Sequence, residues 1–399
     1  MDRGFEETRL PAATAIGDIG RGRRSTGSQD GPAHAPSILF LCPFDLSRYR
    51  GTALRARLTV DALRVAFPCR VICRGGGDGD SIILDADWEG GSRLGAHLRP
   101  LQFSRKAAPH VLQQNPLVVH TFDVLSTLPA VLRWKPRLGL RVVVELHGLL
   151  SAEMGRGGAA ARSLVRWLER FVLRRADQII AMSHTQREYV VSAFGVAPEK
   201  IRVIWGPVDL DVFRYQDPDD GRTFRVGYSG NDFPWQGVDD CLAAAELLSS
   251  DPEVEFVFVT GSGWRTDLGG LARCMRIAAV TREQTAEQLA RCHVLLSPRK
   301  GKAADMQYPF KLSSYLAVGR PVIATDVSDQ RRILEKARCG LIVPPGSPQA
   351  IAEAVLRLKA EAPEARLEMG KRARRFAEDH LSLEQFHMAL VSMYRELGI

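Results

Sequence analysis

The sequence predicts an α/β protein built from two doubly wound Rossmann-like domains that face each other across a cleft. Short apolar strands alternate with amphipathic helices from residue 37 onward, and the alternation starts again after a Pro-, Gly- and Asp-rich stretch at 206–224. A chain of 399 residues is long enough to bury two separate cores. Two such domains in tandem normally hold a ligand between them, at the carboxyl ends of their strands.

The first domain is expected within residues 36–207. Its strands are continuous apolar runs, as in a parallel sheet covered on both faces, and are predicted at 37–44, 70–75, 116–122, 141–148, 178–183 and 201–205. Apolar residues at helical spacing predict helices at 51–67, 161–176 and 185–195. The last of these helices ends at Gly195, a residue that favours a helix C-terminus.

The second domain is expected within residues 208–380. The same reasoning predicts strands at 225–230, 254–261, 293–298 and 321–326, and helices at 238–250, 281–292, 311–319 and 349–361. A C-terminal helix at about 381–399 is expected to pack back onto the first domain.

Residues 1–35 are expected to form a disordered leader without a targeting role, because they lack an apolar signal region. The formal net charge is +8, and the leader contributes none of it, since its five arginines are matched by five acidic residues. A basic folded part fits phosphorylated small molecules, a membrane surface or nucleic acid. No motif for reading nucleic acid is present, so nucleic acid is not expected as a partner.

The seven cysteines are scattered and show neither CxxC pairs nor a paired Cys/His spacing. Reduced thiols, a cytoplasmic protein and no metal site are therefore expected. No apolar run approaches the roughly 20 residues needed to span a bilayer.

Two stretches of the first domain place polar groups at the carboxyl ends of predicted strands. Gly51 and Thr52 lie between the first strand and its helix, where a small residue lets backbone N–H groups approach a ligand. Glu145 and His147 end a buried strand in "VELHG". The alternative interpretations are an ordinary βα turn for the glycine and a structural role for the histidine.

The richest stretch of the second domain is "LSPRKGKAADMQYPFK" (296–311), which leads with Arg299 and Lys311 into a short helix after Pro309. A basic loop at a helix N-terminus suits a diphosphate, because side-chain charge and backbone dipole act on the same oxygens. A solvated charge run and an ordinary helix start remain the alternatives. The turn "VTGSGW", with Gly261 and Ser262, is expected to line the base or sugar rather than the phosphates.

Taken together, several segments resemble the GT-B-fold retaining glycosyltransferases of family 4 (glycosyl transferases group 1). The segments are "VVVELHG", "ADQIIAMS", "KIRVIWGPVDLDVF", "PRKGKAADMQYPFKLSSYLAVGRPVIATD" and "GLIVPPGSPQAIAEAV". The resemblance runs from about Ile38 to the C-terminus. It implies a retaining, metal-independent transfer of a sugar from a nucleotide diphosphate sugar, UDP- or GDP-linked, with the acceptor held by the first domain and the donor by the second.

The resemblance also implies roles for individual residues. His147 would lie near the donor sugar, while Arg299 and Lys311 would stabilise the leaving diphosphate as the bond to the anomeric carbon breaks. The remaining donor-binding candidates are Gly51, Thr52, Gly230, Asn231, Gln236, Gly261, Ser262, Pro309, Phe310, Ser313 and Ser314. No cofactor is implied, because the nucleotide sugar is a substrate.

The sequence departs from the family pattern at four positions. The usual pair of glutamates separated by seven residues is replaced by Met306 and Ser314, and the usual phosphate-binding Arg and Lys by Asn231 and Gln236. These changes indicate either a noncatalytic nucleotide-sugar-binding or scaffold subunit, or an enzyme with rearranged binding. The second hypothesis is favoured, because Arg299 and Lys311 lie on the neighbouring segment. Epimerisation or phosphorolysis would fit the fold without a supporting motif.

The helix predicted at 161–176 has a pattern that is relevant to the type of acceptor and to the location of the protein in the cell. Its arginines at 162, 166, 170 and 174 form one row, beside an apolar face with Leu164, Leu168, Phe171 and Val172. This pattern suits peripheral contact with an anionic membrane surface, such as the inner membrane face, and a lipid-linked acceptor. An ordinary surface helix is the alternative, and a glycan or a small-molecule acceptor remains open.

Overall fold

The computed structural model describes residues 37–47, 51–79, 81–84, 93–154, 158–217, 223–261, 264–271, 273–279 and 281–399. The predicted leader, 1–35, and the candidate residue Ser262 lie outside these ranges.

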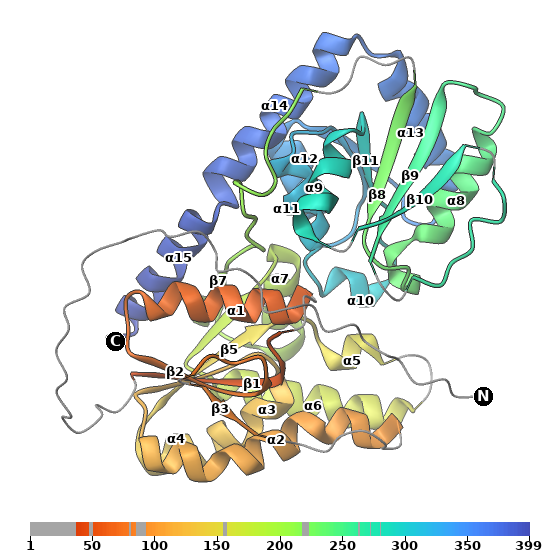
Figure 1. Ribbon diagram of the computed structural model, residues 1–399. Coiled ribbons are helices and arrows are strands. Elements are labelled where there is room, and N and C mark those ends of the chain that lie inside the picture. The colour runs from red at the N-terminus through yellow and green to blue at the C-terminus, as the bar shows by residue number, and fades with distance from the viewer. Residues whose placement is uncertain are drawn as a thin grey trace, which may run out of the picture. The chain divides into compact units, whose positions relative to one another are not determined.

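The first sheet has seven parallel strands in the order β3-β2-β1-β4-β5-β6-β7 (Figure 1). The strands are β1 (Ile38–Asp45), β2 (Cys69–Gly75), β3 (Ile82–Ile83), β4 (Val118–Thr121), β5 (Arg141–Leu146), β6 (Gln178–Ala181) and β7 (Ile201–Val203). The chain order reverses between β1 and β4, the kind of position at which open α/β sheets bind ligands. All six strands predicted from the sequence are present, and β3 is an additional short edge strand.

Along the sequence, the helices of the first domain alternate with its strands. They are α1 (Gly51–Arg64), α2 (Arg93–Gln114), α3 (Val124–Pro129), α4 (Lys135–Leu138), α5 (Leu150–Glu153), α6 (Ala159–Arg175) and α7 (His184–Phe194), with a π-helical turn at Ala130–Trp134 and a 3₁₀ turn at Pro198–Lys200. The sequence did not predict α2, which contains Pro100 and Pro109, or the segment from α3 to α4. Because proline normally ends helices, the prolines in these segments made the sequence pattern unfavourable for helix. Packing against the rest of the domain stabilises these helices.

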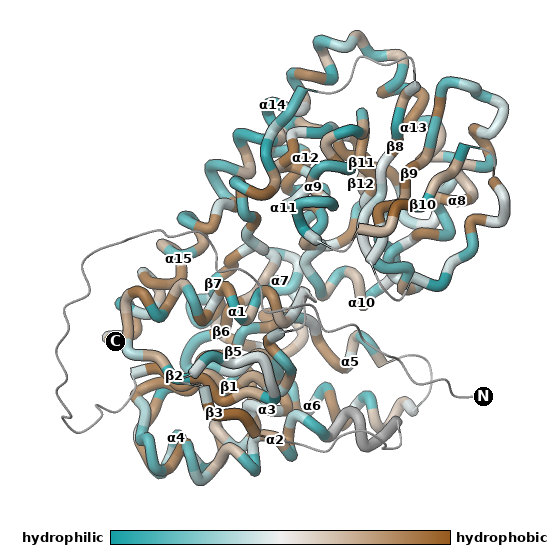
Figure 2. The backbone as a smooth tube through the Cα atoms, in the orientation of Figure 1, coloured by the Kyte–Doolittle hydropathy of each residue, from teal (hydrophilic) through white to brown (hydrophobic). Residues whose placement is uncertain are grey.

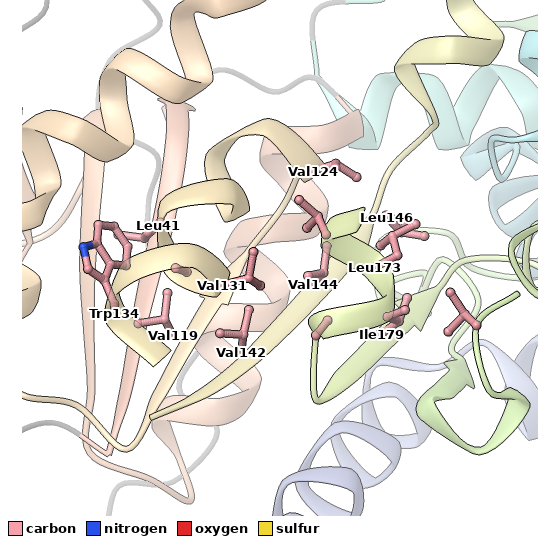
Figure 3. Packing of buried hydrophobic residues seen from close by; sticks show 14 of the residues in the cluster. Leu41, Val119, Val124, Val131, Trp134, Val142, Val144, Leu146, Leu173 and Ile179 are labelled. Carbon is pink, nitrogen blue, oxygen red and sulfur yellow. The ribbon is translucent and has the colours of Figure 1, made fainter. Parts of the chain in front are cut away.

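Two apolar clusters cover the two faces of the first sheet. One contains Val119, Val142 and Val144, which Figure 3 shows beside Val131, Trp134 and Leu173 of the covering helices. The other contains Ile38, Phe40 and Val143 together with residues of the C-terminal helix α15 (Leu383–Glu396), which packs beside α1 (Figure 1). The last helix of the chain thus completes the core of the first domain.

The second sheet has six parallel strands in the order β10-β9-β8-β11-β12-β13. The strands are β8 (Phe224–Ser229), β9 (Val254–Thr260), β10 (Cys274–Ala278), β11 (Val294–Ser297), β12 (Val322–Thr325) and β13 (Gly340–Val343). The helices are α8 (Val238–Leu247), α9 (Arg282–Ala290), α10 (Lys302–Asp305), α11 (Phe310–Ala317), α12 (Gln330–Ala337), α13 (Pro348–Ala360) and α14 (Pro363–His380), with a 3₁₀ turn at Pro234–Gln236.

Separate apolar clusters again cover the two faces of the second sheet, so the predicted fold class of two Rossmann-like domains is confirmed. Figure 2 shows hydrophobic strands and helices of alternating hydropathy, the pattern from which the prediction was made. The sequence missed β10, β13, α10 and α12. Most residues of β10 are exposed or half-exposed, so it lacks the continuous apolar signal of the inner strands.

Of the described helices, none combines the length and the apolar character that a membrane-crossing segment requires.

Candidate active site

The start of helix α11 brings the two domains together. The Phe310 ring lies where a Cβ on Gly206 would come within 2.8 Å of it, and where a Cβ on Gly51 would come within 3.4 Å. Gly51 begins α1 at the carboxyl edge of the first sheet, and Gly206 follows β7. The turn before α1 and the start of α11 are therefore neighbours, as expected for two groups that approach one ligand.

Lys311, the second residue of α11, carries a buried ammonium group. Its Nζ has no hydrogen-bond partner among the described residues and lies 3.8 Å from the centre of the Tyr228 ring. Burial, and then the positive charge of Arg299, hold the pKa of Lys311 well below its usual value. A desolvated cation without a carboxylate partner is costly, so this geometry favours an anionic ligand at Nζ.

The position of Lys311 is relevant to Asn231 and Gln236, which stand where family members usually carry an Arg and a Lys. A Cβ on Gly230 would lie 3.2 Å from Lys311 Nζ, and Gly230 directly precedes Asn231, one of the positions where family members carry a cation. The side chain of Lys311 thus contacts the loop that follows β8. Lys311 Nζ therefore lies beside Gly230, the residue before Asn231.

Arg299 supplies the second buried cation and follows β11 directly. The residue is 2% exposed, and its Nη1 and Nη2 donate hydrogen bonds to Gln307 O (2.8 Å) and Gln307 Oε1 (3.3 Å). Its Nε has no partner among the described residues, and burial lowers the pKa of Arg299 to about 10. Arg299 remains charged at neutral pH and keeps one free donor.

Gln307 joins this cation to the first domain. Its Nε2 donates to Glu153 Oε1 of α5 over 2.8 Å. Its side chain also lies beside Gly148, where a Cβ would be 3.5 Å from Gln307 Cγ. Because Gly148 follows His147, the chain places the candidate histidine and Arg299 on either side of one glutamine.

His147 lies directly after β5, and its side chain is 9% exposed. Nε2 is 3.3 Å from Glu145 Oε1, and neither ring nitrogen has a partner in hydrogen-bond geometry among the described residues. The Phe122 ring stands edge-on to the imidazole, with 5.7 Å between centroids. Glu145 and Phe122 hold the ring in place, and Nδ1 is left available to a substrate hydroxyl.

Glu145 is fully buried beside two residues of α1 and one residue of β4. Arg55 Nε lies 2.5 Å from Oε1, Thr59 Oγ1 donates to Oε2 over 3.1 Å, and His120 Nε2 is 3.6 Å from Oε2. Burial, the largest single influence, would raise the pKa of Glu145, but the Arg55 guanidinium together with the neighbouring His120 and His147 outweighs it and holds the pKa well below its usual range. The carboxylate is therefore a charged anchor for the histidine.

The contacts around Glu145 reach the segment after β7 and the C-terminal helix α15. Arg55 also donates to Trp205 O over 2.7 Å, on the segment that leads to Gly206. His120 Nδ1 lies 2.6 Å from the Tyr394 hydroxyl of α15, and burial lowers the pKa of His120. The C-terminal helix thus contributes a side chain to the support of the candidate site.

The loop after β8 carries three further donor-binding candidates. Gly230 has φ +131°, Asn231 is exposed and accepts a hydrogen bond from the Tyr228 hydroxyl through its backbone oxygen (2.6 Å), and Gln236 Oε1 is buried without a partner among the described residues. The loop ends at Gly237, which precedes α8 with φ +71°.

We expect Gly237→Ala to destabilise the protein more than Gly269→Ala. Both glycines have positive φ, at +71° and +62°, so both substitutions cost about 1–2 kcal/mol of backbone strain. Only at Gly237 would the new Cβ meet a backbone atom, Pro298 O at 1.8 Å, whereas nothing lies within 4 Å at Gly269. Urea unfolding should show an additional loss of about 1–3 kcal/mol for Gly237→Ala. Equal losses would contradict the close approach of this loop to Pro298.

The structure corrects the expected role of Ser313. Its side chain is 1% exposed, and its hydroxyl donates to Gly206 O over 2.7 Å and lies 2.8 Å from the Tyr308 hydroxyl. Ser313 therefore fastens α11 to the domain junction rather than facing a ligand. Ser314 is half-buried on the same helix, and its side chain forms no hydrogen bond with a described residue.

Met306 also differs from the glutamate that the family pattern would place there. It is 4% exposed and belongs to the apolar cluster of the first domain, while its backbone oxygen accepts from Gln186 Nε2 over 2.9 Å. The side chain thus packs across the junction as a core residue. A glutamate carboxylate at this position would be buried among apolar side chains.

Three further candidates, Thr52, Pro309 and Gly261, lie at the ends of helices or strands. Thr52 is exposed in the first turn of α1, Pro309 is the N-cap residue of α11, and Gly261 is exposed after β9 with open space at its Cβ position. The nearby Asp329, which the sequence analysis did not single out, accepts hydrogen bonds from His184 N (2.7 Å) and Trp205 Nε1 (2.7 Å) and so caps α7 across the junction.

Sequence reasoning missed the supporting residues Arg55, His120, Gln307 and Tyr394. One signal was present, since Glu145 and His147 are two residues apart and residues at that spacing in a strand share a face. The partners of Glu145 come from positions 25 to 90 residues away in the chain. No local pattern links them.

Two family models match most of the chain. The model of Glycosyltransferase Family 4 matches residues 51–212, and the model of Glycosyl transferases group 1 matches residues 223–361. The two matches cover one Rossmann-like domain each.

A curated relative is D-inositol 3-phosphate glycosyltransferase of Nocardioides sp., which is 26% identical over 304 residues. The match covers 66% of this chain and 64% of that protein, so the chain spans less than two thirds of the relative's length.

Solved structures share the fold. Sucrose-phosphate synthase from Thermosynechococcus elongatus is 19% identical with a TM-score of 0.74, over 90% of this chain and 99% of that one. Anabaena HepE in complex with UDP-glucose is 14% identical with a TM-score of 0.69, over 90% of this chain and 100% of that one.

Proposed function

Because the chain belongs to the family 4 glycosyltransferases, which have the GT-B fold, we propose that it transfers a sugar from a nucleotide diphosphate sugar to an acceptor with retention of anomeric configuration and without a required metal. The acceptor class remains a glycan, a lipid-linked molecule or a small molecule. UDP- or GDP-linked sugars are the proposed donors, and the HepE complex with UDP-glucose supports a uridine nucleotide.

One observation carries this proposal. Lys311 and Arg299 are two buried cations at the carboxyl edge of the second sheet, and each keeps a nitrogen without a partner among the described residues. Neither group forms an ion pair with a carboxylate of the described residues, so their desolvation is offset only by the hydrogen bonds of Arg299 to Gln307 and by the contact of Lys311 with the Tyr228 ring. A diphosphate at the start of α11 would supply the missing acceptor oxygens, and the N-terminal end of the helix would add to the attraction.

The mechanism follows from these positions. As the bond between the anomeric carbon and the diphosphate oxygen breaks, negative charge grows on the leaving diphosphate, and the fixed charges of Lys311 and Arg299 stabilise it. His147, held by Glu145, is placed to bind a hydroxyl of the donor sugar through Nδ1. Its contribution is to orient the sugar between the two domains.

We also propose that the protein acts in the cytoplasm, where nucleotide sugars are available to it. The support is the state of its cysteines, because all seven are free and five of them are buried. Proteins kept in oxidising compartments usually pair such thiols.

A thermal-shift screen against UDP, GDP, ADP, TDP and CDP tests the donor site. One diphosphate is expected to stabilise the protein by about 2.7 kcal/mol when present at about 100 times its dissociation constant. If none stabilises the protein at millimolar concentration, the four missing family charges were not replaced, and the chain is better described as a noncatalytic scaffold subunit.

The same purified protein tests the finer claims. With the donor base known, release of the diphosphate from the matching nucleotide sugars is expected to continue in the presence of EDTA. NMR of the transferred sugar is expected to show the anomeric configuration of the donor. Loss of turnover in EDTA would overturn the metal-independent mechanism, and inversion would overturn retention.

A further inference from the structure

Helix α6 exposes a surface that the transfer reaction does not use. Leu164 is 59% exposed and Trp167 is 57% exposed, and the Trp167 ring stacks on Phe171 with 5.6 Å between centroids. Around the helix, Trp167 lies about 200° from the buried Glu169, so the tryptophan is at the outward pole. A large aromatic residue at this place contributes nothing to the core, and its contact with Phe171 adds little to the stability of the helix.

The charges on the same helix are one-sided. Four arginines, Arg162, Arg166, Arg170 and Arg174, are exposed and form no ion pair with a carboxylate among the described residues. The helix has a single acidic residue, Glu169, and it points inward, where it accepts hydrogen bonds from Ser151 N (3.1 Å) and Ser151 Oγ (2.5 Å). The exposed face is therefore purely cationic around its apolar residues.

The cationic surface continues past the end of α6. A hollow of about 510 Å³ is lined by Val131, Lys135, Pro136, Arg174, Arg175 and Lys200. The guanidinium of Arg175 also lies 3.7 Å from the centre of the Phe171 ring, which keeps another charge beside the aromatic residues. Nearby, Leu132 is 50% exposed.

The position of α6 connects this surface to the candidate site. The helix follows β5 and α5, so its first residues lie at the carboxyl edge of the sheet, where His147 is found. Glu169 fastens α6 to α5, and Glu153 of α5 bonds to Gln307 in the second domain. The exposed surface on α6 is thus linked through α5 to the segment around Gln307 and Arg299.

We propose that α6 docks on an anionic lipid bilayer, with Trp167 and Leu164 inserted at the interface and the arginines on lipid headgroups. Amphipathic helices with tryptophan, leucine and arginine bind bilayers through buried apolar area together with attraction to anionic lipids. Resting on the proposed transferase function, this docking assigns a lipid-anchored acceptor to the enzyme, because such an acceptor would be held at the sheet edge where His147 lies.

Co-sedimentation with large vesicles tests the docking, using pure phosphatidylcholine and a mixture with roughly one third phosphatidylglycerol. The full chain is expected to bind the anionic vesicles and to be released by high salt, since screening shortens the reach of the charges. The variants Arg162→Glu/Arg166→Glu and Leu164→Ser/Trp167→Ser are each expected to weaken binding about tenfold or more.

Matched controls come from the second domain. Arg357→Glu/Arg375→Glu makes the same change in net charge at exposed arginines of α13 and α14, and Leu356→Ser removes an apolar side chain that is 42% exposed. Both are expected to bind vesicles as the unchanged protein does. Equal losses in controls and α6 variants, or no binding to anionic vesicles, would overturn the docking.

Thermal stabilisation by the nucleoside diphosphate separates this inference from the proposed function. The α6 variants are expected to keep it, because Trp167 and the arginines lie outside the donor site. If the diphosphate stabilises the protein while vesicles do not bind, only the docking fails. If vesicles bind and no diphosphate stabilises, the docking stands and the lipid-anchored acceptor falls with the transferase function.

Discussion

Lys311→Met is expected to lower the affinity for the nucleoside diphosphate about 30- to 150-fold while making the ligand-free protein more stable. A hydrogen bond to a charged group is worth about 2–3 kcal/mol, which gives the loss of affinity. The same substitution removes a buried amino group without a hydrogen-bond partner, whose desolvation costs the ligand-free protein about 1–3 kcal/mol. Calorimetric titration and urea unfolding of one variant measure both effects.

Lys300→Met is the matched control for Lys311. It removes an ammonium group from the same basic segment, but Lys300 Nζ is already paired with Asp239 (2.6 Å) and Asp240 (3.0 Å). Diphosphate affinity is expected to stay within about threefold of the unchanged protein, since a paired surface charge contributes little. If the two variants lose affinity equally, Lys311 acts through general charge and not as a direct ligand.

The pH dependence follows from the lowered pKa of Lys311. Above its folded pKa and below the usual value of 10.5, the unfolded chain holds a proton that the folded protein lacks, so Lys311 makes stability rise with pH in that range. Diphosphate binding restores the charged form and takes up a proton. Titrations in two buffers of different ionisation enthalpy are expected to detect this uptake, and Lys311→Met is expected to abolish it.

Glu145→Gln is expected to cost about 3–5 kcal/mol of unfolding free energy. The substitution keeps the shape of the side chain but leaves the Arg55 guanidinium buried without its counter-ion, and breaking a buried pair has costs of this size. Because the pKa of Glu145 is lowered in the folded protein, its contribution is fully present above the usual value of 4.5 and is lost as pH falls through the folded pKa. Urea unfolding at several pH values measures both.

Two further variants sharpen this experiment. Glu255→Gln removes one partner of a half-exposed pair with Arg225 (3.0 Å) and is expected to cost less than about 1 kcal/mol. Arg55→Met/Glu145→Leu removes both buried charges and is expected to recover part of the lost stability. A double variant as unstable as Glu145→Gln would mean that packing, not the unpaired charge, sets the cost.

Glu145→Gln also separates positioning from folding. His147 loses its charged anchor, so kcat is expected to fall at temperatures where the variant is fully folded, while diphosphate binding at Lys311 persists. A parallel loss of diphosphate binding would contradict this division, because the proposed diphosphate ligands Lys311 and Arg299 lie in the other domain.

The predictable parts of this protein share one property: their signals are local. Continuous apolar strands such as 141–146 predicted the sheets, and the basic run before α11 is the local signal behind the proposed diphosphate site. The edge strand β10, with few buried residues, and α2, with two internal prolines, gave weak or contrary local signals. β10 forms because it pairs with β9 along its whole length, and α2 forms because it buries Phe103, Ala107 and Val111 in the first core.

The same distinction holds within the site. The sequence by itself determined the fold class, the positions of His147, Arg299 and Lys311 at strand and helix ends, and the absence of the usual glutamate pair at Met306 and Ser314. Only the tertiary structure decided that Ser313 faces the domain junction, that Met306 joins the core of the other domain, and that Lys311 lies against Gly230. The physical reason is that each of these depends on a contact between residues far apart in the chain, where burial and partner geometry, rather than local pattern, set the direction of a side chain.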